Sequence, residues 1–92
     1  MNSFQIKDFT AKYNVHQTFI KSFSSLLDQN NVEDLDITDK NISIDVENLE
    51  FELLGNDAVA FQSDINQDGR TIGYYKLVFD LKGKLIDEFF VI

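Results

Sequence analysis

The sequence predicts an α+β fold in which an antiparallel sheet follows an N-terminal helix. Up to about residue 29, apolar residues recur at steps of three and four, the spacing of an amphipathic helix. From about residue 42 they alternate with polar residues, the spacing of strands. Turn sequences rich in Asn, Asp and Gly separate the alternating segments. We therefore expect a meander of about four to five strands with one principal helix packed on one face.

Length and composition predict one small domain. With 92 residues, of which 43% are hydrophobic, the chain can bury one core, so we expect residues 1–92 to form a single domain. Cysteine is absent, which excludes disulfides and thiolate chemistry. The sequence has no apolar run of membrane-spanning length and no signal-peptide pattern at its start, so we expect a cytoplasmic protein.

The principal helix is expected near residues 14–29. Asn14 followed by Gln17 fits an N-cap with a capping box, although the periodicity also allows a start near Asp8. Two asparagines, Asn30 and Asn31, are expected to end the helix, because Asn adopts the left-handed conformation of a helix end readily. The apolar stripe comprises Phe9, Tyr13, His16, Ile20, Phe23 and Leu27, with Phe19 and Leu26 beside it.

The residues before this helix carry a weaker pattern. Phe4 and Ile6 alternate with polar neighbours. This alternation fits either a short edge strand or an extended arm packed on the core.

Residues 42–53 alternate between apolar and polar side chains, with one phase change at Glu47-Asn48. A two-residue hairpin loop there would set Asp45 opposite Glu50, an unfavourable pair of like charges. One long strand with a bulge at the same point would separate the two carboxylates. Both alternatives remain open, and both turn the apolar side inward and the carboxylates toward solvent.

The last two strands form a predicted hairpin around Asp80-Leu81-Lys82-Gly83. Asp at the first position and Gly at the fourth indicate a type I turn with a glycine bulge, which pairs Asp80 with Lys84. Phe79 then faces Leu85. Continued without interruption, this register places Val78 opposite Ile86, Lys76 opposite Glu88 and Tyr75 opposite Phe89.

A second predicted hairpin turns at Asn66-Gln67-Asp68-Gly69. If Gly69 is again a bulge, Asn66 pairs with Arg70 and Phe61 with Tyr75. The expected inner face, on which the helix packs, comprises Val59, Phe61, Ile65, Tyr75, Leu77, Phe79, Leu85, Phe89 and Val91. The expected outer face is half polar and comprises Ala58, Ala60, Gln62, Ile72, Tyr74, Lys76, Val78, Ile86, Glu88, Phe90 and Ile92.

Candidate catalytic and metal sites are few, and none predicts an enzyme. Asp64–Gly69 matches the opening of a calcium loop, but Tyr75 stands where that loop needs a bidentate Glu, so we expect an ordinary turn. His16 lies within the apolar stripe without a second ligand. Asp87 and Glu88 alternate across a strand and cannot act together. We expect no catalytic residue, no metal and no cofactor.

Negative charge is concentrated between Asp28 and Asp57, where ten acids accompany a single base, Lys40. The net charge of -8 opposes binding to nucleic acid or to an anionic membrane and favours a basic protein partner. The alternative is a solvated surface that maintains solubility. The expected partner-binding residues are Asp36, Asp39, Asp45, Glu47, Glu50 and Glu52.

The segment Gly73–Asp87, GYYKLVFDLKGKLID, resembles the closing hairpin of some small bacterial immunity proteins, including those paired with contact-dependent growth-inhibition toxins. The resemblance implies a non-catalytic cytoplasmic protein that neutralises one toxin domain. No functional residue is carried over from it. Two alternatives compete: an acidic nucleic-acid mimic that inhibits a DNA- or RNA-processing enzyme, and a structural subunit that forms a homodimer through the outer face.

Overall fold

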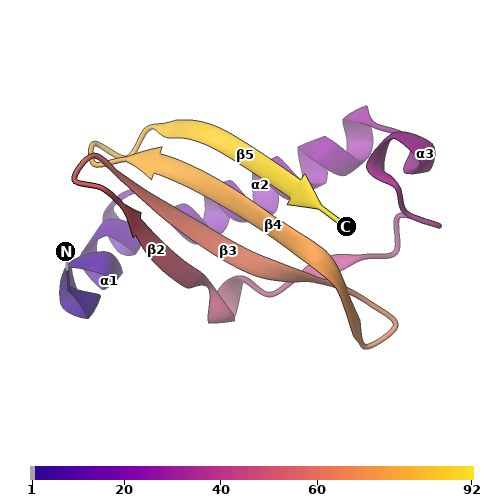
Figure 1. Ribbon diagram of the computed structural model, residues 1–92, viewed down its shortest axis with the longest axis horizontal. Helices are drawn as coiled ribbons and strands as arrows, with labels where there is room; N and C mark the ends of the chain where they lie inside the picture. The colour runs from indigo at the N-terminus through magenta and orange to yellow at the C-terminus, as the bar shows by residue number, and fades with distance from the viewer. Residues whose placement is uncertain (1) are drawn as a thin grey trace.

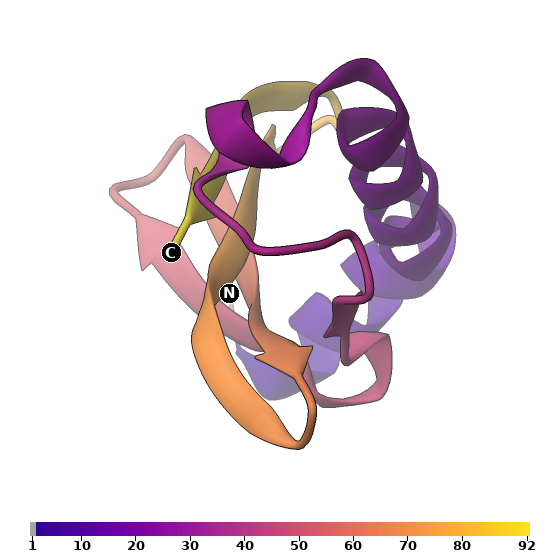
Figure 2. The same cartoon turned by 90° about the vertical axis from the view of Figure 1, so that its right-hand side faces the viewer.

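The computed structural model describes residues 2–92, and the side chains of Ser3 and Phe4 lie outside that description. Figures 1 and 2 show two layers, an antiparallel sheet and a layer of helices on one of its faces. The predicted α+β class is confirmed. The elements in chain order are α1 (Ser3–Lys12), α2 (Val15–Gln29), α3 (Val32–Leu35), β1 (Ser43–Ile44), the 3-10 helix η1 (Val46–Asn48), β2 (Glu50–Leu54), β3 (Ala58–Gln67), β4 (Arg70–Asp80) and β5 (Leu85–Val91). Within the sheet, β1 and β2 both pair with β3, followed by β4 and β5.

Helix α1 replaces the strand or arm expected at the N-terminus. Asn2 accepts a hydrogen bond from the backbone N–H of Gln5, whose side chain accepts one from the N–H of Asn2, and these two bonds form a capping box. Ile6 and Phe9 are both buried, because residues three apart lie on the same face of a helix. The period-two interpretation of this segment is therefore wrong.

Helix α2 begins and ends close to the predicted residues, but by other means. Asn14 has a left-handed backbone (φ 51°) and makes no side-chain cap, so the capping box expected with Gln17 is absent. Left-handed Asn14 instead separates α1 from α2. At the other end Asn30 is extended, and its side-chain Nδ2 donates to the carbonyl of Leu26 (2.9 Å). The helix therefore ends through a side-chain bond and not through a left-handed residue.

The buried stripe of α2 is rotated from the predicted one. Val15, Phe19 and Phe23 are buried at steps of four, whereas His16 and Ile20 are exposed. The prediction placed His16 inside because it drew one continuous apolar stripe from Phe9 to Leu27. The break at residue 14 resets the helical phase.

Residues 42–53, for which a hairpin and a long bulged strand were both considered, run as one interrupted edge strand. Ile44 pairs with Ile65, and Glu50 pairs with Gln62, so β1 and β2 lie along the same strand β3. Between them the chain leaves the ladder, and the N–H of Asp45 donates to the hydroxyl of Ser63 (2.8 Å). The hairpin alternative is wrong. The long-strand alternative is correct in outline, with η1 in place of a simple bulge.

The turn of the β3–β4 hairpin contains two residues, whereas three were predicted. Asp68 and Gly69 both have positive φ (51° and 77°), as a type I′ turn requires. Gln67 therefore pairs with Arg70, and an irregularity opposite Ile65 then brings Phe61 opposite Leu77. The predicted register is displaced by two residues. Because two is the side-chain period of a strand, the inner residues of β3 and β4 still face inward.

The β4–β5 hairpin begins as predicted and then changes register. The N–H of Asp80 donates to Lys84 (2.8 Å), and Phe79 pairs with Leu85. The next pair is Val78 with Asp87, which leaves Ile86 as the extra residue of a β-bulge. A one-residue shift exchanges the two faces of a strand, so the remainder of β5 faces opposite to the prediction.

Because of the bulge, the residues of β5 that follow it lie on the faces opposite to those predicted. Phe90 pairs with Tyr75 and Glu88 with Leu77, so these two β5 side chains belong to the inner face. Phe89 pairs with Lys76 and Val91 with Tyr74, so these two belong to the outer face. Ile72, expected outside, is half-buried against the core.

The core lies between the inner face and the first two helices. Aromatic rings contact one another within it: the ring centroid of Phe9 lies 6.0 Å from that of Phe61, and the centroid of Phe23 lies 5.2 Å from that of Tyr75. The buried cluster comprises Ile6, Phe9, Val15, Phe19, Phe23, Val59, Phe61, Ile65, Tyr75, Leu77 and Phe79. Among residues 2–92, no helix has the length and apolarity needed to cross a membrane.

Candidate partner-binding site

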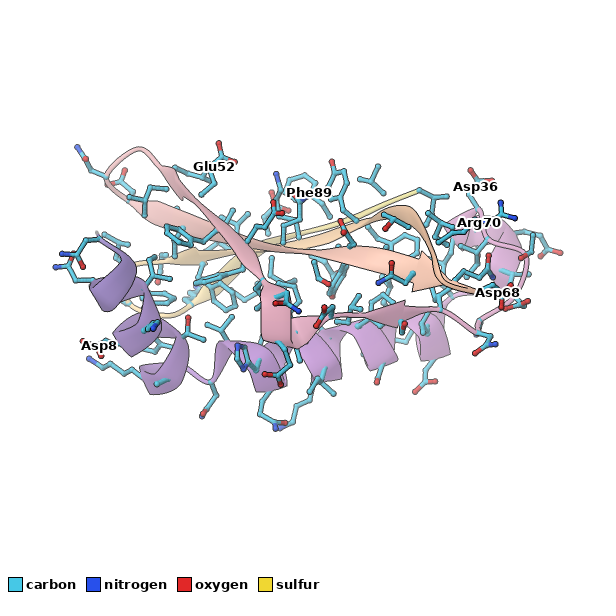
Figure 3. The ribbon with its side chains drawn as sticks, turned by 90° about the horizontal axis from the view of Figure 1, so that it is seen from below. Asp8, Asp36, Glu52, Asp68, Arg70 and Phe89 are labelled. Atoms are coloured by element: carbon cyan, nitrogen blue, oxygen red, sulfur yellow. The ribbon has the colours of Figure 1, made fainter. Side chains whose placement is uncertain are left out.

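The six predicted partner-binding carboxylates are all exposed, but they do not form one row. In Figure 3, Asp36 lies near one end of the molecule, which is 38 Å long, and Glu52 lies in the other half. They divide into three pairs along the chain, one after α3, one at η1 and one on β2. These pairs differ in what they contact.

Asp36 and Asp39 lie near the tip of the β3–β4 hairpin. Asp36 is the left-handed residue that ends α3 (φ 61°). Asp39 accepts hydrogen bonds from the N–H of Asn41 (2.8 Å) and from the side-chain amide of Gln67 (3.3 Å). In Figure 3, Asp36 lies at the same end as Asp68 and Arg70. Both carboxylates therefore belong to the connection that closes this end of the fold.

Asp45 and Glu47 lie at the interruption of the edge strand. Asp45 caps η1, accepting from the N–H of Glu47 (3.2 Å) and from the side-chain amide of Asn48 (2.7 Å). Glu47 is exposed on the same turn. Asp45 therefore has a structural role in addition to its charge, which Glu47 does not share.

Glu50 and Glu52 lie on the outer face. Each is paired with an outer residue of β3, Glu50 with Gln62 and Glu52 with Ala60. In Figure 3, Glu52 projects from the side of the sheet opposite to α1 and α2. These two carboxylates are presented on a rigid strand and are the pair best placed to meet a partner.

The outer face is organised in two central cross-strand rows. One row runs from Glu50 through Gln62 and Lys76 to Phe89. The other runs from Glu52 through Ala60 and Val78 to Asp87. Acids therefore stand at the ends of a row whose middle is small and apolar.

Lys76 is held by aromatic rings in the centre of this face. Its ammonium lies 5.8 Å from the centroid of Tyr74 and 5.7 Å from that of Phe89. A cation over an aromatic face is attracted by the ring quadrupole. Beside Lys76, a shallow hollow of about 300 Å³ lies over Ala60 and is bordered by Glu50 and Glu52.

The helix layer contrasts with the sheet in charge. In α1 and α2 the only acids are Asp8 and Asp28, accompanied by Lys7, Lys12 and Lys21. The remaining acids lie after α2, in α3, η1, the sheet and the loops between them. The net negative charge of the protein therefore lies outside α1 and α2.

A second hollow lies on the other side of β2. A cleft of about 550 Å³ separates α1 and the start of α2 from β2, and its lining includes Ile6, His16, Glu47 and Phe51. His16 is exposed at this cleft, contrary to its predicted place in the core.

The candidate calcium loop is a hairpin turn in the structure. Asp64 lies on strand β3, and the side chain of Asn66 accepts a hydrogen bond from the hydroxyl of Thr71 (3.2 Å). Only Asp68 and Gly69 turn the chain. Over residues 2–92, no group of three or more His, Cys, Asp or Glu side chains is placed to hold a metal ion.

No protein-family model, curated protein or solved structure matches the chain.

Two features of the site escaped the sequence interpretation. Phe89 was expected inside, and only the bulge at Ile86 places it outside. Tyr75 donates a hydrogen bond to Glu88, which was expected on the outer face. Either Asp87 or Glu88 could face outward as far as the nearby sequence is concerned. The sequence around them therefore predicts neither the position of Phe89 nor the bond between Tyr75 and Glu88.

Proposed function

We propose that this chain is a non-catalytic acidic binding protein that neutralises a basic protein partner. The observation that supports it is the separation of charge between α1 and α2 and the rest of the chain. Carboxylates occupy the sheet, α3 and the connections, whereas α1 and α2 together carry two acids and three lysines. A charge field on one side of a protein steers an oppositely charged partner and orients it during the encounter.

The proposed partner is a bacterial toxin domain with a basic surface, and the protein acts as its immunity protein. The hairpin resemblance over residues 73–87 makes this partner the first to test. The rigid sheet suits the role, because pre-organised surfaces lose little conformational freedom on binding.

The experiment is a matched pair of charge reversals. The protein, carrying a cleavable tag, recovers its partner from a bacterial lysate, and association is then measured at increasing salt. Glu47→Lys with Glu52→Lys should slow association at least about tenfold, because charge steering accounts for factors of this size and more in association rates. Exposed charges are screened beyond about 8 Å at physiological ionic strength, so salt should also slow the parent.

The control is Asp8→Lys with Asp28→Lys, which changes the net charge equally but in the helix layer. Asp45 is left unchanged because it caps η1. If the two double variants associate equally fast, only net charge matters and Glu47 and Glu52 do not belong to the contact surface. If no basic protein is recovered, the proposed function is wrong.

A second candidate function is a subunit that dimerises through strand β5. Leu85, Ile86, Phe89 and Val91 are all exposed on this strand, which forms one edge of the sheet. An exposed apolar edge strand can pair with another strand. Light scattering decides this alternative directly, because a dimer doubles the measured mass.

A further inference from the structure

We infer that the outer face of the sheet, which carries Lys76 and Phe89, is the surface on which a basic protein partner docks. This inference rests on the proposed function and names the contact surface within it. The expected surface was a row of carboxylates, and the structure divides that row into three separate pairs. Only Glu50 and Glu52 share a face with exposed apolar side chains.

The outer face has no covering layer among residues 2–92. Both long helices pack on the inner face, as Figure 2 shows in side view. In Figure 3, Phe89 and Glu52 project on the side away from them. Phe89 is 42% exposed and lies on the edge strand β5, opposite Lys76 of β4. Aromatic side chains, Phe among them, are enriched at the cores of protein interfaces.

The centre of this face resembles the centre of an interface. Ala60 and Val78 are buried although no other element covers them, because larger neighbours on the adjoining strands surround them. They form a small apolar floor between Glu52 and Asp87. Phe89 stands in the next row. An apolar centre with a polar rim is typical of specific interfaces.

Charge decides the kind of partner. Lys76 is the only base in the two central rows, against Glu50, Glu52 and Asp87. A second copy of this chain would bring the same acidic rim and would be repelled. A basic surface would find carboxylates at the rim of the hollow and aromatic rings beside it.

The position of Lys76 shows that this face can bind a cation. Its ammonium already lies over both Tyr74 and Phe89, at 5.8 and 5.7 Å. The rings and carboxylates that attract an internal cation also attract an arginine or lysine of a partner. In the bound complex, a partner cation competes with Lys76 for these rings.

The test uses nuclear magnetic resonance on the full isotope-labelled chain. The probe is a synthetic helical peptide with a Leu stripe flanked by Arg. Saturable shifts are expected at Tyr74, Lys76 and Phe89. Phe89→Ala should weaken binding about tenfold, the effect of a moderate interface hot spot.

The matched control is Leu53→Ala. Leu53 is 39% exposed, close to the 42% of Phe89, but it pairs with Val59 on the inner face of the same sheet and does not line the hollow over Ala60. This variant should bind as the parent does. Lys76→Gln should bind about threefold more tightly, because it removes the competing cation. A gain in affinity cannot result from misfolding.

The remaining outcomes each overturn the inference in a different way. Shifts confined to Asp36, Asp39, Asp45 and Glu47, with Phe89→Ala binding as the parent, would place the contact on the edge and leave the proposed function standing. Concentration-dependent shifts of the outer face without peptide would show a homodimer interface. Absence of binding to the peptide, with a basic partner recovered from the lysate, would overturn the surface and leave the proposed function standing.

Discussion

The ring of Phe90 stacks on the ring of Phe23, with 6.3 Å between centroids and 29° between planes. This contact joins the edge strand β5 to the middle of α2. Phe89, the preceding residue, projects into solvent on the other face. Two identical neighbouring side chains therefore have different roles.

Phe90→Ala should lower the free energy of unfolding by about 2 to 4 kcal/mol, because it removes an aromatic side chain from the core boundary. Phe89→Ala should lower it by less than about 1 kcal/mol, because most surface substitutions have small effects. Urea denaturation of both variants measures the difference. Equal losses would contradict the bulge at Ile86.

Substitutions in the centre of the core should cost more. Phe23→Ala and Leu77→Ala should each lower the free energy of unfolding by about 2 to 5 kcal/mol, through the cavity that each leaves. Phe23 contacts Tyr75, and Leu77 is fully buried on β4. Chemical denaturation gives the values. Losses below about 1 kcal/mol in both would mean that the inner face is assigned wrongly.

The hydroxyl of Tyr75 predicts a loss of stability at alkaline pH. Burial first, and then the hydrogen bond and charge of Glu88, raise the pKa of Tyr75 far above its ordinary value of about 10, while a hydrogen bond with Ser22 opposes the shift. Above pH of about 10 the unfolded chain releases this proton and the folded chain retains it. The Tyr75 hydroxyl therefore makes its full contribution to the free energy of unfolding below that pH, and this contribution falls as the pH rises above it.

The measurement is the free energy of unfolding between neutral and alkaline pH. The decline due to Tyr75 is at most about 1.4 kcal/mol for each pH unit. Tyr75→Phe should lack this part of the decline, whereas Tyr74→Phe, on the outer face, should retain it. If Tyr75→Phe declines as steeply as the parent, the Tyr75 hydroxyl ionises within the folded protein.

Gly73 should be intolerant of any side chain. A Cβ atom at this position would overlap the carbonyl oxygen of Val91 and approach the Cα of Ile92 at 2.8 Å. Gly73→Ala should therefore displace the end of β5 and lower the free energy of unfolding by about 1 to 3 kcal/mol, the cost of overpacking. Gly55→Ala is the comparison, because no atom lies within 4 Å of its added Cβ.

The amide exchange rates of β5 separate the two glycine variants. Gly73→Ala should speed exchange near Val91, because the strand end is forced away from β4. Gly55→Ala should lower the free energy of unfolding only because alanine tolerates the positive φ of 63° at this position less well than glycine. Unchanged exchange near Val91 in Gly73→Ala would show that β5 accommodates the methyl group.

Calcium at micromolar concentration should leave the protein unchanged. The residues from Asp64 to Gln67 belong to strand β3 and do not curl around a common point. The position that would supply a bidentate carboxylate is occupied by Tyr75. Isothermal titration should show no specific heat. A tight site that Asp68→Ala abolishes would contradict this expectation.

The sequence was sufficient for the parts of the fold set by periodicity. The inner residues of β3 and β4 and the helix over α2 were predicted, because burial on one face imposes a strict period. The turn at Asp80–Gly83 was also predicted, since its Asp and Gly occupy positions with defined backbone angles.

The parts that escaped prediction depend on contacts distant in the chain. Asp68-Gly69 fits a two-residue turn as well as the longer one expected, so local chemistry did not decide the register. The hydrogen bond that the backbone N–H of Asp45 donates to the hydroxyl of Ser63 joins residues 18 apart in the sequence, at the point where the edge strand is interrupted. Of the predicted site, the exposure of six carboxylates was correct, whereas their grouping required the sheet topology.

The β-bulge at Ile86 makes β5 tolerant of a change in its own length. Loss of the Ile86 codon in frame would place Asp87 directly after Leu85, and every later residue would keep its partner, Phe89 opposite Lys76 and Phe90 opposite Tyr75. Glu88 would still accept the hydrogen bond of Tyr75. Related chains that differ only by this residue would therefore present the same two faces, so a single deletion at the bulge would leave the partner surface unchanged.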